Sequence, residues 1–144
     1  TLDFGAYYNG YISDITRTVA VGKPSEKLVE MYNAVLESQL LALEKVGPGM
    51  TGAEADAVSR DYLKSKGLGE AFGHSLGHGI GLEVHEGPGL NFRTEVVLEP
   101  NMTVTIEPGA YIPGVGGVRI EDDILITETG NEILNHSDKQ LIIL

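Results

Sequence analysis

The segment that most restricts the fold is GHSLGHGIG at residues 73–81, where glycine recurs four times in nine residues. Each glycine would cost about 1 kcal/mol in a helix. The two histidines therefore do not lie on an HExxH zinc helix, which also needs a glutamate where Ser75 stands. The pattern predicts extended backbone, or backbone with positive φ, that passes close to a ligand or a neighbouring strand. With His85 just beyond, three of the four histidines fall within twelve residues, which favours a functional site.

A β-hairpin is predicted at the start of the chain. Asn9-Gly10 is a strong signal for a two-residue turn, and the residues on either side, up to residue 21, are rich in Tyr, Ile, Thr and Val. Such a hairpin places Asp3 and Asp14 nearly opposite each other, within a residue or two of register. Side chains alternate between the faces of a strand, so Thr16 shares a face with Asp14 and is expected to donate a hydrogen bond to it.

Two helices are predicted next. Apolar residues recur at three- to five-residue steps over residues 24–46, and the Gly-Pro-Gly run at 47–49 ends this helix. Thr51 and Glu54 form a capping-box pattern that begins a second helix, which runs to about Lys66. We expect both helices to cover a sheet and to carry no chemistry.

Two further strands are predicted in the last third of the chain. Residues 102–106 are apolar and end at Glu107, and site residues commonly lie at strand ends. Residues 118–127 are expected to form a single strand that contains an acidic run at 121–123.

The acidic run leaves a choice of ligand open. Alternation places Arg119, Glu121 and Asp123 on one face of the predicted strand. Composition does not select Glu121 over Asp123 as a metal ligand. At least one of Asp122 and Asp123 is expected to be a solvated charge on an edge strand.

Five residues in these segments have the chemistry of a metal site: Asp3, Asp14, His78, Glu107 and Glu121, with Asp123 as the alternative to Glu121. Four carboxylates and one imidazole, without sulfur, suit a pair of divalent ions such as Mn²⁺, Co²⁺ or Zn²⁺. Two such ions, about 3.5–4 Å apart, can share a water and lower its pKa toward about 7. Hydrolysis at neutral pH is the natural interpretation.

Composition narrows the classes of partner. The net charge of −11 argues against nucleic acid, because phosphate binding needs clustered Lys and Arg. The sequence has no apolar run of membrane-spanning length and no leader, so we expect neither a membrane partner nor secretion. The absence of cysteine excludes disulfides and thiolate ligands, and we expect a cytoplasmic protein. The start at Thr1, with Asp3 close behind, indicates a fragment of a longer chain.

Taken together, the motifs resemble the catalytic half of the Xaa-Pro dipeptidase (prolidase) and aminopeptidase P group. This group belongs to the pita-bread metallopeptidase family, which also includes methionine aminopeptidase. The resemblance covers essentially all of the chain and rests on LDFGAYYNGYISDITRT, GHSLGHGIGLEVHEGPG, TIEPGAY and VRIEDD. It implies an α+β, pita-bread (creatinase/aminopeptidase) fold, in which helices cover a curved antiparallel sheet. Residues 1–144 would be the C-terminal part of the metallopeptidase catalytic domain, truncated at the N-terminus.

The resemblance also implies a ligand arrangement. Asp3 would chelate one metal ion, His78 and Glu107 would hold the other, and Asp14 and Glu121 would bridge both. In this way the resemblance selects Glu121 over its neighbours in the acidic run. Mn²⁺ is the expected metal, with Co²⁺ and Zn²⁺ as alternatives.

Catalytic roles follow from the same resemblance. His85 matches the histidine that bonds the scissile carbonyl or the tetrahedral intermediate. His74 matches an additional active-site histidine of the proline-specific members, or else it supports the loop. Arg119 would orient and balance the carboxylates. Glu107 would take the proton of the attacking water. Tyr111 either lines the site or packs.

The function implied is that of a dinuclear-metal exopeptidase that hydrolyses the bond before proline, most directly an Xaa-Pro dipeptidase. Its substrates would be small peptides with proline at the second position, and the full-length protein would be a homodimer. An aminopeptidase P that removes the residue before proline is the alternative. Methionine aminopeptidase shares the ligands, but its motif forms are less similar. From another class, a non-catalytic pita-bread binding module is disfavoured, because such relatives have lost ligands that this chain retains.

Overall fold

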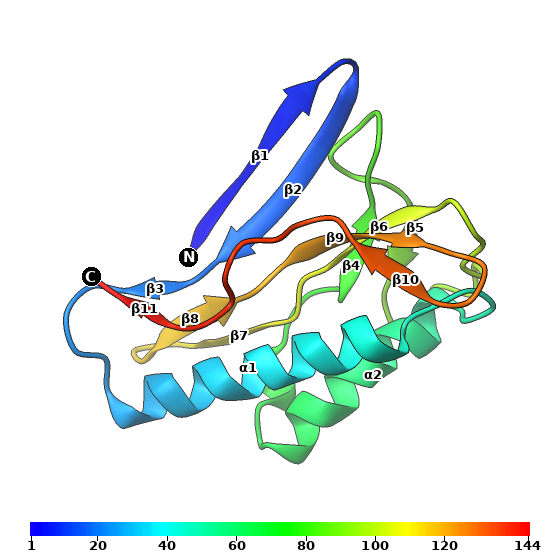
Figure 1. The fold of residues 1–144 in the computed structure, drawn as a ribbon. Helices are drawn as coiled ribbons and strands as arrows, with labels where there is room; N and C mark the ends of the chain where they lie inside the picture. Colours follow the sequence, from blue (N-terminus) through cyan, green and yellow to red (C-terminus); the bar gives the residue numbers. More distant parts are fainter.

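The computed structural model describes residues 1–144. Figure 1 shows two helices on one side of a sheet and a hairpin that projects from the other side. The first elements along the chain are β1 (Leu2–Tyr8), β2 (Tyr11–Arg17), β3 (Val19–Ala20), α1 (Glu26–Lys45), α2 (Gly52–Ser65) and a 3₁₀ turn, η1 (Gly69–Ala71). The remaining strands are β4 (Gly77–Gly79), β5 (Glu86–Leu90), β6 (Thr103–Ile106), β7 (Gly109–Ile112), β8 (Gly116–Arg119), β9 (Asp122–Ile126), β10 (Asn131–Ile133) and β11 (Ile142–Ile143).

The main sheet has the order β10-β9-β6-β4-β5, and every neighbouring pair in it is antiparallel. Helices α1 and α2 pack on each other and cover one face of this sheet (Figure 1). The apolar core lies between the two layers and includes Val35, Leu63, Val104, Ile106 and Ile124. Burial of these side chains leaves the opposite face of the sheet free to carry polar groups. No helix combines the length and the apolar character needed to cross a membrane.

Local capping signals set the helix ends. The side chain of Ser25 accepts a hydrogen bond from the backbone N–H of Leu28, so α1 begins after Ser25. In α2 both halves of the capping box form, between Thr51 and Glu54. Gly67, with φ of 75°, follows the last turn of α2. Both predicted helices are therefore confirmed to within two residues.

The predicted hairpin is confirmed. Asn9 and Gly10 have φ of 51° and 89°, the positive values that the tight hairpin turn requires. Asp3 lies opposite Thr16, two residues from Asp14. Strand β1 is exposed along its whole length, and Figure 1 shows the hairpin tip far from the helices. The base of the hairpin meets the end of the main sheet, and this contact places Asp14 at the site.

The prediction of one strand over residues 118–127 is wrong. Strand β8 pairs with β7 in a two-stranded sheet, whereas β9 joins the main sheet. The chain changes partner at Glu121, whose backbone N–H donates to the Thr16 carbonyl at 3.0 Å. At this point the backbone of β2 pairs with Glu121, and this pairing separates β8 from β9.

The prediction that Asp122 or Asp123 is solvated is also wrong, since both are buried. Asp122 pairs with Arg17 at 2.7 Å and with Lys139 at 2.8 Å. Asp123 lies on the other side of β9 and accepts a hydrogen bond from the backbone N–H of Asp14 at 2.9 Å. Each carboxylate is buried because a partner distant in sequence binds it. The edge-strand interpretation did not include these partners.

The glycine-rich segment is not helical, as predicted; its residues Gly77–Gly79 form β4, and none of its glycines has positive φ. Strand β4 lies between β5 and β6. A Cβ atom on Gly77 would stand 1.9 Å from the carbonyl oxygen of Thr105 in β6. Residue 77 must therefore be glycine because the backbones of β4 and β6 approach each other closely here. This close approach places His78 next to β6, the strand that ends at Glu107.

Candidate metal centre

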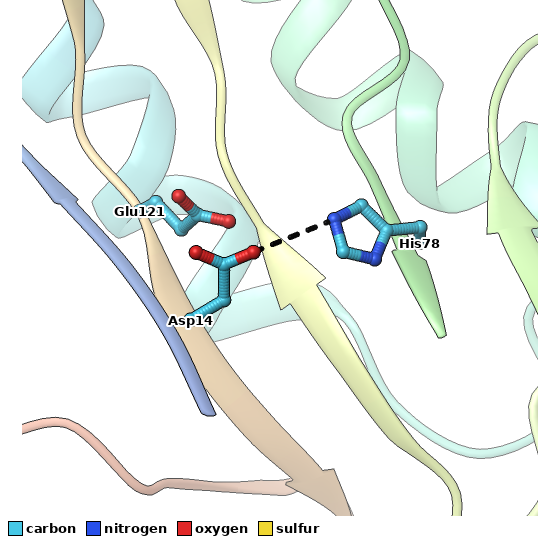
Figure 2. Close-up of side chains that lie close together, drawn as sticks. All are labelled: Asp14, His78 and Glu121. Atoms are coloured by element: carbon cyan, nitrogen blue, oxygen red, sulfur yellow. Dashed lines mark ion pairs between the residues drawn. The ribbon is translucent and has the colours of Figure 1, made fainter. Parts of the chain in front are cut away.

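Three predicted ligands meet where β2, β4 and the start of β9 converge. Asp14, His78 and Glu121 each offer a ligand atom, and these atoms lie within 4.8 Å of one another. Figure 2 shows the three side chains pointing toward one another from three separate segments. The Nε2 atom of His78 is 3.9 Å from Oδ2 of Asp14. This spacing is suited to a shared cation.

Glu107 joins the group from the end of β6. Its Oε1 atom lies 3.2 Å from Nε2 of His78 and accepts a hydrogen bond from Thr105 Oγ1 at 3.1 Å. The other ring nitrogen of His78, Nδ1, lies 3.0 Å from the carbonyl oxygen of Gly79. A carbonyl can only accept, so in the neutral ring Nδ1 carries the proton and the lone pair of Nε2 faces the carboxylates. A metal-binding histidine is typically fixed in this way.

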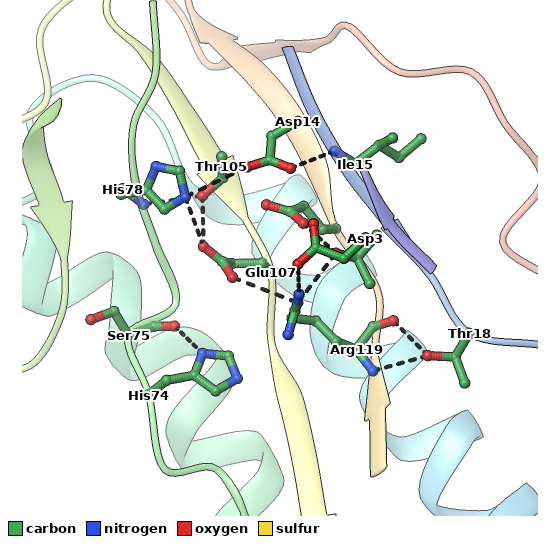
Figure 3. A network of polar contacts seen from close by, with 12 residues as sticks. Asp3, Asp14, Ile15, Thr18, His74, Ser75, His78, Thr105, Glu107 and Arg119 are labelled. Carbon is green, nitrogen blue, oxygen red and sulfur yellow. Dashed lines mark hydrogen bonds and ion pairs between the residues drawn. The ribbon is translucent and has the colours of Figure 1, made fainter. Parts of the chain in front are cut away.

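Asp3 lies at the rim of the same cavity, which has a volume of about 680 Å³. Its half-exposed carboxylate is hydrogen-bonded to Nη2 of Arg119 (Figure 3). Arg119 also donates to the hydroxyl of Tyr111 at 2.9 Å, and its Nε atom is 3.8 Å from Oε2 of Glu107. The guanidinium thus lies between two predicted ligands, and Tyr111 is one of the residues that line the cavity.

The prediction that Thr16 donates to Asp14 is wrong. The Thr16 hydroxyl donates to Oε2 of Glu121 at 2.5 Å, and Arg119 Nε donates to the Thr16 oxygen at 3.2 Å. Asp14 receives its hydrogen bond from the backbone N–H of Ile15 at 2.9 Å. Thr16 donates to Glu121 instead of Asp14 because the backbone bridge between Thr16 and Glu121 brings their side chains together.

Burial raises the pKa of three carboxyl groups in this cavity, those of Asp14, Glu107 and Glu121. Burial is the main cause for Glu107, whose pKa rises to about 7, and for Glu121, whose pKa rises to about 8 with the charge of Glu107 as the next cause. The pKa of Asp14 also rises, first through burial and then through the charge of Asp3. Closely spaced carboxyl groups in a partly dry site gain from a bound cation, so the donor set fits divalent metal ions.

Two further histidines line the cavity. The ring of His85 lies 4.3 Å from that of His78, edge to face. His74 lies against Phe72, and its Nδ1 atom is 2.8 Å from the carbonyl oxygen of Ser75. Nδ1 therefore carries the proton of the neutral ring. Burial lowers the pKa of His74, and its buried Nε2 atom, which has no protein partner, is a hydrogen-bond acceptor.

Sequence reasoning did not assign Asp123 a place behind the metal ligands. Its carboxylate holds the backbone of Asp14, and its Oδ1 atom is buried without a partner. Burial raises its pKa to about 6. The alternation of side chains along the strand was the available signal, because it placed Asp123 on the same face as the candidate ligand Glu121.

The model of the metallopeptidase family M24 matches residues 1–128. The Xaa-Pro dipeptidase of Pyrococcus furiosus is 52% identical over 141 residues, which are 98% of this chain and 40% of that protein. The solved structure of an Xaa-Pro dipeptidase from Bacillus anthracis is 66% identical, with a TM-score of 0.97 over 99% of this chain and 40% of that one. An X-Pro aminopeptidase from Thermotoga maritima is 48% identical, with a TM-score of 0.95 over the same shares.

These matches confirm the predicted fold: the chain has the pita-bread fold of the prolidases, as a truncated piece. It spans about 40% of the length of the curated relatives that it matches. The family model covers the residues that contain all five predicted ligands. The chain belongs to the metallopeptidase family M24.

Proposed function

We propose that the protein containing this chain is a two-metal exopeptidase that hydrolyses the peptide bond before proline, most directly an Xaa-Pro dipeptidase. The observation that carries the proposal is the convergence of Asp14, His78 and Glu121, with ligand atoms within 4.8 Å of one another. Glu107, 3.2 Å from His78, and Asp3, at the rim of the same cavity, complete the proposed ligand set. When bound, two divalent ions would supply Lewis-acid polarisation and a water of lowered pKa.

The side chains of the site have separate tasks in this proposal. Glu107 takes the proton of the attacking water and passes it to the leaving nitrogen. His85, beside His78, faces the developing charge on the scissile carbonyl. Arg119 holds Asp3 and lies close to Glu107, which keeps both carboxylates oriented. His74 lines the same cavity and would contact the bound substrate.

Small peptides with proline at the second position are the proposed substrates, because close relatives carry the names Xaa-Pro dipeptidase and X-Pro aminopeptidase. Aminopeptidase P activity is the second candidate, since the X-Pro aminopeptidase from Thermotoga maritima has a TM-score of 0.95 with this chain. Mn²⁺ as the metal, a homodimeric full-length protein and a cytoplasmic location remain parts of this proposal. Residues 1–144 are proposed to be the C-terminal part of the catalytic domain.

Metal stoichiometry is the first test. Calorimetric titration of the full-length protein with Mn²⁺ should give two ions per chain, and His78→Ala should reduce that number. Lys45→Ala, at the end of α1, is the matched control and should change nothing. Absence of Mn²⁺, Co²⁺ and Zn²⁺ binding by the full-length protein would overturn the proposal.

Substrate length separates the two candidates. An Xaa-Pro dipeptidase should cleave Ala-Pro and leave Ala-Pro-Ala intact, whereas an aminopeptidase P should release alanine from the tripeptide. Cleavage of neither peptide by the metal-loaded protein would exclude both activities. Glu107→Gln should abolish whichever cleavage the wild-type protein performs.

A further inference from the structure

An ion pair on α2 ties this helix to the segment that leads into β4. Nε and Nη2 of Arg60 bond the two carboxylate oxygens of Asp56, one turn earlier, at 2.6 and 2.9 Å. Asp56 is fully buried, and Arg60 is partly buried. A two-pronged pair of this kind is more directional than an exposed helix pair, which contributes only about 0.2–0.5 kcal/mol.

The same two side chains hold the backbone of residues 72–76, which is neither helix nor strand. Arg60 donates through Nη1 to the Phe72 carbonyl at 3.0 Å and through Nη2 to the His74 carbonyl at 2.8 Å. Asp56 Oδ1 accepts from the backbone N–H of Leu76 at 3.0 Å. Three backbone groups that no sheet ladder satisfies are thus fixed by one pair.

This segment carries His74 into the candidate site. The guanidinium of Arg60 lies 4.3 Å from the ring centre of Phe72. The Phe72 ring in turn packs edge to face with the His74 ring, with 5.0 Å between the ring centres. Nδ1 of His74 is 2.8 Å from the carbonyl of Ser75. The orientation of the imidazole therefore follows from the position of the backbone that Arg60 and Asp56 hold.

We propose that Asp56 and Arg60 are positioning residues, which set the orientation of the His74 imidazole at the wall of the cavity. Neither is among the residues that line the cavity, and neither is a candidate ligand, so they act only through the segment that they hold. The proposal rests on the proposed peptidase function. It predicts a loss of kcat/KM without an equal effect on metal binding.

A double-mutant cycle in the full-length protein tests the route through His74. Arg60→Met should lower kcat/KM for Ala-Pro about 10–100-fold, the usual range for loss of a supporting partner. In a His74→Ala background the same change should have little further effect, because the group it positions is gone. Mn²⁺ stoichiometry should stay at two in every variant. Lys64→Met, one turn further along α2, is the matched control and should leave kcat/KM unchanged.

Additive losses from Arg60→Met and His74→Ala, or unchanged kcat/KM in Arg60→Met, would overturn the proposal. If Arg60→Met fails to fold, Asp56→Asn replaces it, because it keeps the volume and removes the charge that orients the guanidinium.

Nitrogen-15 NMR of His74 gives a readout independent of activity. A single tautomer protonated on Nδ1 is expected in the wild type and in Lys64→Met, and a mixture in Arg60→Met. An inactive wild type would refute the peptidase proposal, while an unaltered His74 spectrum in Arg60→Met would refute the positioning role.

Discussion

The hydroxyl of Thr16 donates a hydrogen bond to Oε2 of Glu121, 2.5 Å away, although the two residues are 105 positions apart. Their backbones meet as well, since Glu121 N–H donates to the Thr16 carbonyl. Arg119 Nε donates to the same hydroxyl oxygen, so the Thr16 proton is directed at the glutamate. One side chain of the hairpin therefore fixes a candidate ligand at the end of the main sheet.

Thr16→Val keeps the shape of the side chain and removes this donor. We expect Mn²⁺ affinity to fall about 10–100-fold, because ligands that lose their supporting hydrogen bond bind metal less well. Thr16→Ser retains the hydroxyl and should stay close to the wild type. Calorimetric titration of the three proteins provides the comparison, and equal affinity in Thr16→Val would show that the bond does not support metal binding.

Stability of the metal-free protein should fall as the pH rises from 6.5 to 8.5. The pKa values of Glu107 and Glu121 rise from 4.5 in the unfolded chain to about 7 and about 8 in the fold. Across this window the folded state keeps protons that the unfolded chain has released, so the free energy of unfolding decreases with pH. Burial lowers the pKa of His74 below the unfolded value of 6.5, so its opposing contribution is confined to the lower end of the window and ends about one pH unit above 6.5.

Urea unfolding in EDTA at pH 6.5, 7.5 and 8.5 measures this slope. Glu121→Gln, which cannot ionise, should have a flatter dependence. Saturating Mn²⁺ should remove the loss at high pH, because the cation replaces the protons on the carboxyl groups. A free energy of unfolding that rises with pH in EDTA would contradict the raised pKa values.

Local signals predicted much of the fold. Asn9-Gly10 fixed the hairpin turn, and Thr51 with Glu54 fixed the start of α2, because in each case the interacting groups lie within a few residues. The close approach at Gly77 was also predicted from the spacing of glycines. These features need no knowledge of which distant segment packs against them.

Features that depend on distant partners were not predictable in the same way. Alternation placed Asp122 and Asp123 on opposite faces of the strand. It could not show that Arg17 pairs with Asp122, or that the backbone N–H of Asp14 donates to Asp123. The break in the predicted strand before Asp122 has the same origin. The site residues were found from motif resemblance, whereas the positioning role of Arg60 required the contacts with residues 72–76.

Arg17→Met should destabilise the fold by about 1–3 kcal/mol, because it leaves buried acceptors without their donor while Lys139 still pairs with Asp122. Arg17 bonds Asp122 at 2.7 Å and also donates to the carbonyls of Thr16 and Glu121. Lys139 remains near Asp122, but it lacks the planar fork that reaches the three acceptors. Chemical denaturation measures the change. Lys23→Met removes an exposed cation and should stay within about 0.5 kcal/mol of the wild type.

Gly77→Ala should separate the glycines that the site needs from those that it tolerates. The new methyl group would stand 1.9 Å from the Thr105 carbonyl oxygen, so β4 and β6 would have to move apart. Overpacking typically destabilises by about 1–3 kcal/mol, and here it would also shift His78 relative to Glu107. We therefore expect a loss of stability together with weaker Mn²⁺ binding. Gly73→Ala meets no atom within 4 Å and is the matched control. Equal effects of the two substitutions on denaturation and on metal titration would mean that the packing of β4 against β6 does not set the geometry of the candidate metal centre.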